Sequence, residues 1–255
     1  MVSLARVPLT SPTPSPSSTR RSALITGASR GIGAATARCF AARGWALQLL
    51  ARDDSALGAL ASDLRSQGTV VHWATVDLSK AESIPAGVET LLTAGGPPGV
   101  LINNAGAGYT APLATMSLQD WQWLVQLNLT SVLQVTQAVL PGMRSAGGGL
   151  IVNIGSHAAD HAFPEWGGYG MTKAALAAFS RSLALEEASQ GIRVTTVTLG
   201  AVNTPLWDTP TVHVDLDRRA MLEPEHVAHA LLQLAEQPLR QRIETLTLLP
   251  AAGAL

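Results

Sequence analysis

The sequence predicts an α/β domain built on a seven-stranded, mainly parallel sheet with helices on both faces. Short apolar runs alternate with helical patterns from residue 22 onward, and this alternation is typical of βαβ units. Several of the apolar runs are nearly continuous, as strands covered on both faces require. Hydrophobic residues make up 47% of the 255 residues and charged residues 14%, so the chain can bury a large core.

These patterns place each element in turn. Strands are expected at residues 23–26, 46–51, 70–76, 100–103, 150–154, 192–198 and 243–249. Helices are expected between them, at residues 32–43, 55–67, 81–94, 117–143, 169–187 and 224–236. Pro224 suits the start of the last helix because of its fixed φ and missing N–H. The weakly periodic stretch 203–222 is long for a connection inside a domain, and we expect a functional lid or disorder there.

The first twenty residues differ in composition from the rest. Prolines and serines alternate there, and no acidic residue precedes Asp53. This composition predicts a disordered leader at residues 1–20, followed by a single domain at 21–255. A transit peptide is also poor in acids, but the prolines oppose the amphipathic helix that it needs. We find no start typical of a secretion signal and no apolar run that suggests a membrane span, and we expect a cytoplasmic protein.

The overall charge and the cysteine count exclude several classes of partner. The net charge is −1, so there is no basic surplus for nucleic acid. Cys39 is the only cysteine, which excludes an intrachain disulfide and a cysteine-cluster metal site. His157 and His161 have metal-ligand spacing, but they follow a strand end and Asp160 is the only acid nearby. We therefore expect no metal. We expect the two histidines either to line a substrate pocket or to lie exposed in a loop.

Three polar side chains indicate acid–base chemistry. Tyr169 stands four residues before Lys173, so the two share one face if residues 167–187 form a helix. A nearby ammonium favours the ionised phenol, which makes the tyrosine a proton donor and acceptor near neutral pH. Ser156 follows a predicted strand, and its hydroxyl can hydrogen-bond the same substrate oxygen. A tyrosine and a lysine at this spacing are also common on ordinary helix surfaces.

A glycine-rich turn joins the first strand to the first helix. Residues 26–33 read T-G-A-S-R-G-I-G. Glycines at such a turn let the backbone approach a pyrophosphate, and the helix N-terminus supplies unpaired N–H groups. The turn alone is weak evidence, and its glycine spacing differs from the usual dinucleotide fingerprint. The strand before it and the helix after it are the right context for a phosphate-binding loop.

Together these motifs resemble the short, single-domain branch of the short-chain dehydrogenase/reductase family over residues 22–255. The motifs occur in the family's order: the glycine turn, Asp77-Leu78, N-N-A-G at residues 103–106, Asn128, Ser156, and Tyr169-x-x-x-Lys173. The resemblance implies a Rossmann-type, doubly wound sheet of strand order 3-2-1-4-5-6-7. It also implies an NAD(P)-dependent oxidoreductase, similar to NADP-dependent oxoacyl and carbonyl reductases, that transfers hydride between a nicotinamide and a carbonyl or secondary alcohol.

The resemblance assigns a role to each member of a catalytic tetrad. Tyr169 would be the general acid in reduction and the base in oxidation. Lys173 would lower the pKa of Tyr169 and hold the nicotinamide ribose. Ser156 would stabilise the substrate oxygen. Asn128 would position a water that joins Lys173 to solvent, although a buried asparagine can also simply tie two helices together.

The resemblance also implies the cofactor site. In the family, the N-N-A-G segment holds the adenosine ribose, the acid before Leu78 bonds the adenine, and the segment after the sixth strand fixes the carboxamide and a phosphate. This chain has Leu199 where the family usually has proline in that last turn. The full set of implied cofactor residues is Gly27, Ser29, Arg30, Gly31, Ile32, Gly33, Arg52, Asp77, Leu78, Asn104, Ala105, Gly106, Tyr169, Lys173, Gly200, Val202 and Thr204.

The end of the second strand favours NADP(H) over NAD(H). An acid at this position would bond the ribose 2′-OH and repel a 2′-phosphate, but the strand ends in Ala51-Arg52. Arg52 and Arg30 can both pair with a dianionic phosphate. Asp53 is the counter-evidence, because a shifted register would bring its carboxylate to the ribose. NAD(H) therefore remains possible, and with it an NAD-dependent alcohol dehydrogenase.

The substrate and the assembly are less specified. Oxoacyl thioesters, hydroxy acids, small ketones and quinones are candidate substrates, and Trp166 and Trp207 fall where an apolar substrate would be contacted. A non-enzymatic NADP(H)-binding sensor is the alternative from another class of function, although such relatives tend to lose the tyrosine or the lysine.

The family is usually dimeric or tetrameric through the helices at 117–143 and 169–187. The alanines at 174, 175, 177 and 178 suit such an interface or packing on the sheet.

Overall fold

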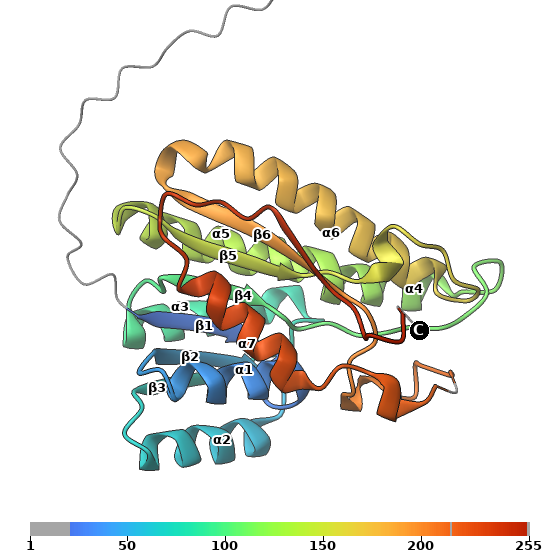
Figure 1. Ribbon diagram of the computed structural model, residues 1–255, viewed down its shortest axis with the longest axis horizontal. Helices are drawn as coiled ribbons and strands as arrows, with labels where there is room; N and C mark the ends of the chain where they lie inside the picture. The colour runs from blue at the N-terminus through green and yellow to red at the C-terminus, as the bar shows by residue number, and fades with distance from the viewer. Residues whose placement is uncertain (1–20, 215, 254–255) are drawn as a thin grey trace, which may run out of the picture.

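The computed structural model describes residues 21–214 and 216–253 (Figure 1). They form a seven-stranded sheet of order β3-β2-β1-β4-β5-β6-β7, and every neighbouring pair of strands is parallel. The predicted strand order is confirmed. The expected leader at residues 1–20 lies outside the described residues. No helix within the described ranges is long and apolar enough to cross a membrane.

The elements follow the predicted alternation. The strands are β1 Ser22–Thr26, β2 Ala46–Ala51, β3 Val71–Thr75, β4 Val100–Asn103, β5 Gly149–Ile154, β6 Ile192–Leu199 and β7 Thr245–Leu248. The helices are α1 Gly31–Ala41, α2 Asp54–Ser66, α3 Ile84–Gly95, α4 Leu118–Val125, α5 Ser131–Ser145, α6 Gly167–Glu186 and α7 Pro224–Ala235. A short 3₁₀ turn, Ala81–Ser83, precedes α3, so that helix begins later than residue 81.

Two apolar layers hold the helices to the sheet. Successive strand residues face opposite sides, so in β1 Ile25 joins one cluster and Leu24 joins the other. The first cluster packs α1, α2 and α7 on one face, with Phe40 among its largest fully buried side chains. The second packs α3, α5 and α6 on the other face. Figure 1 shows α1 and α7 side by side on one face of the sheet, and α5 and α6 lie on the other face.

The helix predicted at residues 117–143 is interrupted. A π turn, Gln126–Thr130, separates α4 from α5, so the prediction of one regular helix was wrong in this detail. The wider turn coincides with Asn128, whose side chain bonds both backbone polar groups of Ala107 across the chain. A π turn of this kind is invisible to helical periodicity and is frequent at functional sites.

The stretch 203–222 contains short ordered pieces rather than one long irregular loop. Two 3₁₀ turns, Pro205–Asp208 and Arg218–Ala220, are joined to the rest by an isolated bridge between Val202 and Leu222. Arg218 donates from Nε to Asn203 Oδ1 at 2.8 Å and from Nη2 to Thr204 O at 2.9 Å. The described part of this stretch is therefore ordered, and its function as a lid stays a prediction.

Candidate active site

A cavity of about 690 Å³ opens at the carboxyl ends of the strands. This is the edge at which doubly wound sheets bind their ligands. Its wall contains every site residue predicted from the sequence except Gly33 and Asn128. The strands β1, β2, β3, β4, β5 and β6 each deliver part of this wall directly after their last residue. Parallel strands therefore bring together side chains that are far apart in the sequence.

The glycine loop is fastened to the segment after β4. Thr26 Oγ1 accepts the backbone N–H groups of Asn104 and Ala105, both at 3.0 Å. Gly27 has φ +66°, and a Cβ there would lie 2.9 Å from Ala105 Cα. A Cβ at Gly33 would lie 2.2 Å from Gly27 O. Gly33 thus lets α1 approach the turn from behind, which explains why it is not part of the cavity wall.

The acidic and basic groups near β2 have separate tasks. Asp53 caps α2 by accepting the N–H of Ala56 at 3.0 Å, and it is not part of the cavity wall, whereas Arg30 and Arg52 are. The register shift that would bring Asp53 to a ribose is absent. At this point the wall therefore carries two guanidinium groups and not the Asp53 carboxylate.

Asp77 lies on the wall beside Arg52. Its Oδ1 accepts the backbone N–H of Ser79 at 3.0 Å and the Ser79 hydroxyl at 2.7 Å. Partial burial is the largest single effect on the pKa of Asp77 and acts to raise it. The Ser79 hydrogen bonds and the positive charges of Arg52 and Lys80 together outweigh burial and lower the pKa. The side chain is therefore a fixed, ionised acceptor at neutral pH.

Ser156, Tyr169 and Lys173 converge at the floor of the cavity. Tyr169 and Lys173 lie on the first turns of α6, and the Lys173 ammonium lies 5.7 Å from the centre of the Tyr169 ring. Lys173 is 6% exposed, and its Nζ donates to Ile154 O at 2.8 Å. Ser156 follows β5 by two residues, caps the 3₁₀ turn His157–Ala159, and hydrogen-bonds Tyr169. The three side chains thus face one small volume, as their spacing predicted.

The protonation of this cluster differs from the expectation drawn from spacing alone. Burial raises the pKa of Tyr169, and the hydrogen bond from Ser156 opposes this rise only in part. Burial also lowers the pKa of Lys173 to about 8. Burial favours the neutral form of both groups, so the net pKa of Tyr169 is raised, and a lowering contribution from the Lys173 ammonium stays a prediction. At neutral pH the tyrosine keeps its proton and Lys173 keeps its charge.

Asn128 lies behind the cavity wall. Its amide bonds the N–H and the C=O of Ala107, both at 2.9 Å, and reaches Thr172 Oγ1 at 3.2 Å. A Cβ at Gly106 would lie 3.1 Å from Asn128 Oδ1, so a larger residue there would press against the Asn128 side chain. The side chain thus ties the segment after β4 to α6. That Asn128 also positions a water remains a prediction.

The segment after β6 covers the glycine loop. Gly200 donates its N–H to Leu248 O at 2.9 Å, so β7 holds the turn in which leucine replaces the family's proline. A Cβ at Gly31 would meet the Thr204 side chain at 3.3 Å, which shows how closely the two loops approach. Val202 O accepts the indole N–H of Trp207 at 2.7 Å. Gly200, Val202 and Thr204 are therefore held on the wall.

The outer part of the wall is aromatic and apolar. Trp166 and Trp207 lie there as expected, with His157 and Phe163 from the loop after β5. His157 stacks on His161 with ring centres 3.8 Å apart, and no group of metal-ligating side chains is found among the described residues. Sequence reasoning missed Trp123 and Leu127, which reach the wall from α4 and the π turn. Their four-residue spacing was a signal for a shared face.

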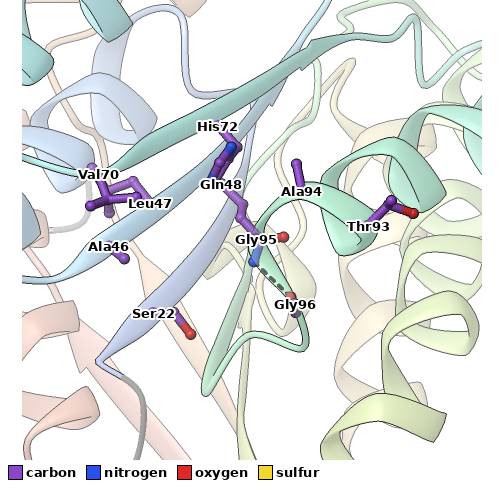
Figure 2. A pocket seen from close by; sticks show the side chains of 10 residues that line it. All are labelled: Ser22, Ala46, Leu47, Gln48, Val70, His72, Thr93, Ala94, Gly95 and Gly96. Carbon is purple, nitrogen blue, oxygen red and sulfur yellow. Dashed lines mark hydrogen bonds between the residues drawn. The ribbon is translucent and has the colours of Figure 1, made fainter.

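A second cavity, of about 370 Å³, lies at the opposite edge of the sheet (Figure 2). It is formed around the amino ends of β1, β2 and β3 and the end of α3. Figure 2 shows the Gln48 side chain directed toward Gly96, whose carbonyl oxygen accepts from Gln48 Nε2 at 2.8 Å. None of the tetrad lies here, so the chemistry belongs to the first cavity.

Comparisons with known proteins agree with this geometry. The family model of short chain dehydrogenases matches residues 21–212. Sulfoacetaldehyde reductase 2 of Chromohalobacter salexigens is 33% identical over 91% of this chain and 94% of its own. An alcohol dehydrogenase of Thermococcus sibiricus complexed with 5-hydroxy-NADP superposes with TM-score 0.83 at 33% identity, covering 90% of this chain and 96% of its own. L-Sorbose reductase of Gluconobacter frateurii, complexed with NADPH and L-sorbose, gives 0.82 at 29% identity over 90% and 95%. The chain therefore belongs to the short-chain dehydrogenase/reductase family of oxidoreductases.

Proposed function

We propose that this chain transfers hydride between NADP(H) and a carbonyl or secondary alcohol, with Tyr169 as general acid and base. The observation that carries the proposal is the common cavity. It holds Ser156, Tyr169 and Lys173 beside a glycine loop and two arginines, with Asp53 turned to a helix cap. The NADP complexes of the related structures support the choice of cofactor.

The residues present fit such a dinucleotide. Gly27 and Gly106 lie on the cavity wall without side chains, so the backbone there can approach a pyrophosphate or a ribose closely. The N-terminus of α1 lacks a side-chain cap at Arg30, so its N–H groups are available to a pyrophosphate. Arg30 and Arg52 would bind the 2′-phosphate, and Asp77 would accept from the adenine amino group.

The chain's own residues would handle the proton and the developing charge. When bound, the nicotinamide supplies or accepts the hydride. In reduction, the Ser156 and Tyr169 hydroxyls would hydrogen-bond the substrate oxygen, and Tyr169 Oη would give it a proton. The raised pKa of Tyr169 keeps that proton in place at neutral pH. The buried ammonium of Lys173 would stabilise the tyrosinate left behind.

The test is calorimetric titration of the purified protein with NADPH and NADH in parallel, followed by NADPH oxidation assays with a panel of carbonyl compounds. We expect much tighter binding of NADPH, and turnover. A preference for NADH would move the ribose contact away from Arg52 and favour an NAD-dependent alcohol dehydrogenase. Tight NADPH binding without turnover on any carbonyl would instead favour a sensor.

The cofactor preference also gives a prediction for a single residue. Arg52→Ala should lower the affinity for NADPH by about tenfold or more, since a charge-assisted hydrogen bond to phosphate contributes about 1.5–3 kcal/mol. The affinity for NADH should stay nearly unchanged. Arg240→Ala, an exposed arginine outside the cavity wall, is the matched control. An equal loss of affinity for both nucleotides would place Arg52 away from the phosphate.

The cytoplasmic location expected from the sequence remains a prediction.

A further inference from the structure

Resting on the proposed function, we propose that the carbonyl substrate is a neutral ketone with a bulky apolar, preferably aromatic, substituent, or the corresponding secondary alcohol. The proposal comes from the outer half of the main cavity, beyond Ser156 and Tyr169. This half is built by α4 with its π turn, by residues 157–166 after β5, and by the described part of the stretch 204–216.

The described residues on the wall of the outer half carry no carboxylate, ammonium or guanidinium. The basic and acidic groups of the cavity wall, Arg30, Arg52 and Asp77, follow β1, β2 and β3 at the glycine-loop end, and Lys173 lies beneath Tyr169. Among the described residues on the wall of the outer half there is no aspartate, glutamate, lysine or arginine, and Asp160, Glu165 and Asp208 of the same segments are not part of the wall. A carboxylate, sulfonate or phosphate on the substrate would lose its hydration without meeting a cation, which is costly.

Several polar groups of this half are already bonded within the protein. The Thr209 hydroxyl donates to Leu206 O and the Thr211 hydroxyl donates to Gly108 O, both at 2.8 Å. The Trp207 indole N–H donates to Val202 O at 2.7 Å. A sugar-like substrate with many hydroxyl groups would find few partners, and unpaired buried polar groups are destabilising. The wall therefore also discriminates against polyols.

Aromatic rings continue from the reactive tyrosine outward. The Trp166 ring meets Tyr169 edge-on at 5.2 Å between centres and meets Trp207 at 5.9 Å, with interplanar angles of 71° and 66°. A carbonyl held by Ser156 and Tyr169 would place its substituent against these rings, with Phe163 and Leu206 also on the wall. Aromatic pairs in such arrangements gain energy beyond the area that they bury.

Residues 209–213 of the outer half are hydrogen-bonded to the loop after β4. Thr110 donates its N–H to Thr211 O at 2.9 Å, and His213 donates its N–H to Thr110 Oγ1 at 2.9 Å. A Cβ at Gly108 would lie 2.8 Å from the Val212 side chain, so the lid packs directly on the loop after β4. A preformed pocket loses little entropy on binding and keeps its selectivity.

The experiment compares kcat/KM for NADPH-dependent reduction of acetophenone, 4-acetylbenzoate and L-sorbose. We expect acetophenone to exceed 4-acetylbenzoate and L-sorbose each by about 100-fold, because buried charges and unpaired hydroxyls are strongly penalised. Equal or better reduction of either polar substrate would overturn the proposal. Trp166→Ala should lower kcat/KM for acetophenone by about tenfold and that for propanone much less. Equal losses for the two ketones would also count against it.

A charge introduced at the mouth gives an independent readout. Val214 lies on the outer wall and is 38% exposed. Val214→Lys should raise the ratio of 4-acetylbenzoate to acetophenone kcat/KM by about tenfold, since an opposite charge nearby offsets desolvation. Val70→Lys, on the opposite edge of the sheet and 60% exposed, should leave the ratio unchanged. An unchanged ratio in Val214→Lys would show that the substituent does not lie in this half.

The failure of the proposed function is distinguishable from the failure of this inference. If NADPH binds but no carbonyl is reduced, the hydride-transfer proposal fails. The pocket is then tested by calorimetric titration of the protein–NADP⁺ complex with 1-phenylethanol and with L-sorbose. Preferential binding of 1-phenylethanol supports an aromatic site, and no binding or a preference for L-sorbose overturns it.

Discussion

At the scale of single residues, burial shifts the protonation of the reactive cluster. Lys173 stands one helical turn from Tyr169, but its Nζ is directed to Ile154 O at 2.8 Å. Burial therefore moves both groups toward their neutral forms, raising the pKa of Tyr169 and lowering that of Lys173 to about 8. A protonated tyrosine beside a charged lysine suits reduction at neutral pH, in which the tyrosine must give up a proton.

Tyr169→Phe tests the role of the tyrosine hydroxyl. Turnover should fall by about 10²–10⁴-fold, as expected for loss of general acid catalysis, while NADPH affinity stays close to that of the wild type. The measurements are kcat and calorimetric affinity. The chain's second tyrosine gives the control, because Tyr109 lies outside the cavity wall and Tyr109→Phe should keep turnover. Retained turnover in Tyr169→Phe would remove the assigned role.

Lys173→Met tests the burial of the ammonium through stability. The pKa of Lys173 is about 8 in the folded protein and about 10.4 in an unfolded chain. Below the folded pKa, folding must bury a charge, and this cost disappears as the pH rises from about 8 to about 10.4. The Tm of the variant minus that of the wild type should therefore be larger at about pH 7 than at about pH 10.

The control for the lysine experiment is the only other lysine. Lys80 is exposed, so the Tm difference between Lys80→Met and the wild type should not follow this trend. A Tm difference for Lys173→Met that is constant between the two pH values would show that the ammonium is not desolvated.

At the scale of elements, the glycine loop and α1 form one unit with the segment after β4. Thr26 supplies the link, because one hydroxyl oxygen accepts two successive backbone N–H groups at 3.0 Å. The contacts of Gly27 and Gly33 leave no space for a methyl group at either position. The loop is therefore shaped by backbone packing before any ligand arrives, which lowers the entropic cost of binding.

Gly33→Ala tests this packing against a matched glycine. The added methyl would lie 2.2 Å from Gly27 O, so the turn must shift, and NADPH affinity should fall by about tenfold or more. Gly58→Ala in α2 would place its methyl 3.5 Å from Trp73, an ordinary contact, and should stabilise the helix by about 0.5–1 kcal/mol. Gly33→Ala with unchanged affinity and Tm would mean that the turn is not rigid.

At the scale of the whole molecule, the two ends of the parallel strands differ in the cavities that lie there. The large cavity lies at the carboxyl ends of the strands, and a smaller one lies around Gln48 at the amino ends. The outer faces of α5 and α6 remain uncovered in the single chain. Leu133 on α5 is 40% exposed, and Ala178 on α6 is exposed while Ala174, Ala175 and Ala177 are half-buried.

We expect sedimentation analysis to show a homodimer or homotetramer assembled through α5 and α6. Ala178→Glu would place a charge in that interface and should dissociate the assembly, because an unpaired buried charge is costly. Leu239→Glu, at a position that is 64% exposed after α7, should leave the assembly intact. A monomeric wild type at micromolar concentration, or an assembly that tolerates Ala178→Glu, would contradict this arrangement.

The sequence by itself determined the fold class, the strand order implied by the family resemblance, and the residues that gather at the cavity. These features follow from local patterns, since alternating apolar runs, a glycine turn and the Tyr169–Lys173 spacing each act over a few residues. The same patterns could not show the π turn at Asn128, because the hydrogen bonds of Asn128 to Ala107 join segments 21 residues apart.

Only the tertiary structure decided the tasks of several ambiguous side chains. Asp53 could have met a ribose, but the geometry makes it the cap of α2. The pKa values of Tyr169 and Lys173 depend on how much protein surrounds them, which spacing does not encode. The aromatic half of the cavity joins Trp123, Trp166 and Trp207 from three separate segments. Burial and long-range contact are properties of the packed chain, so they appear only once the sheet has brought these segments together.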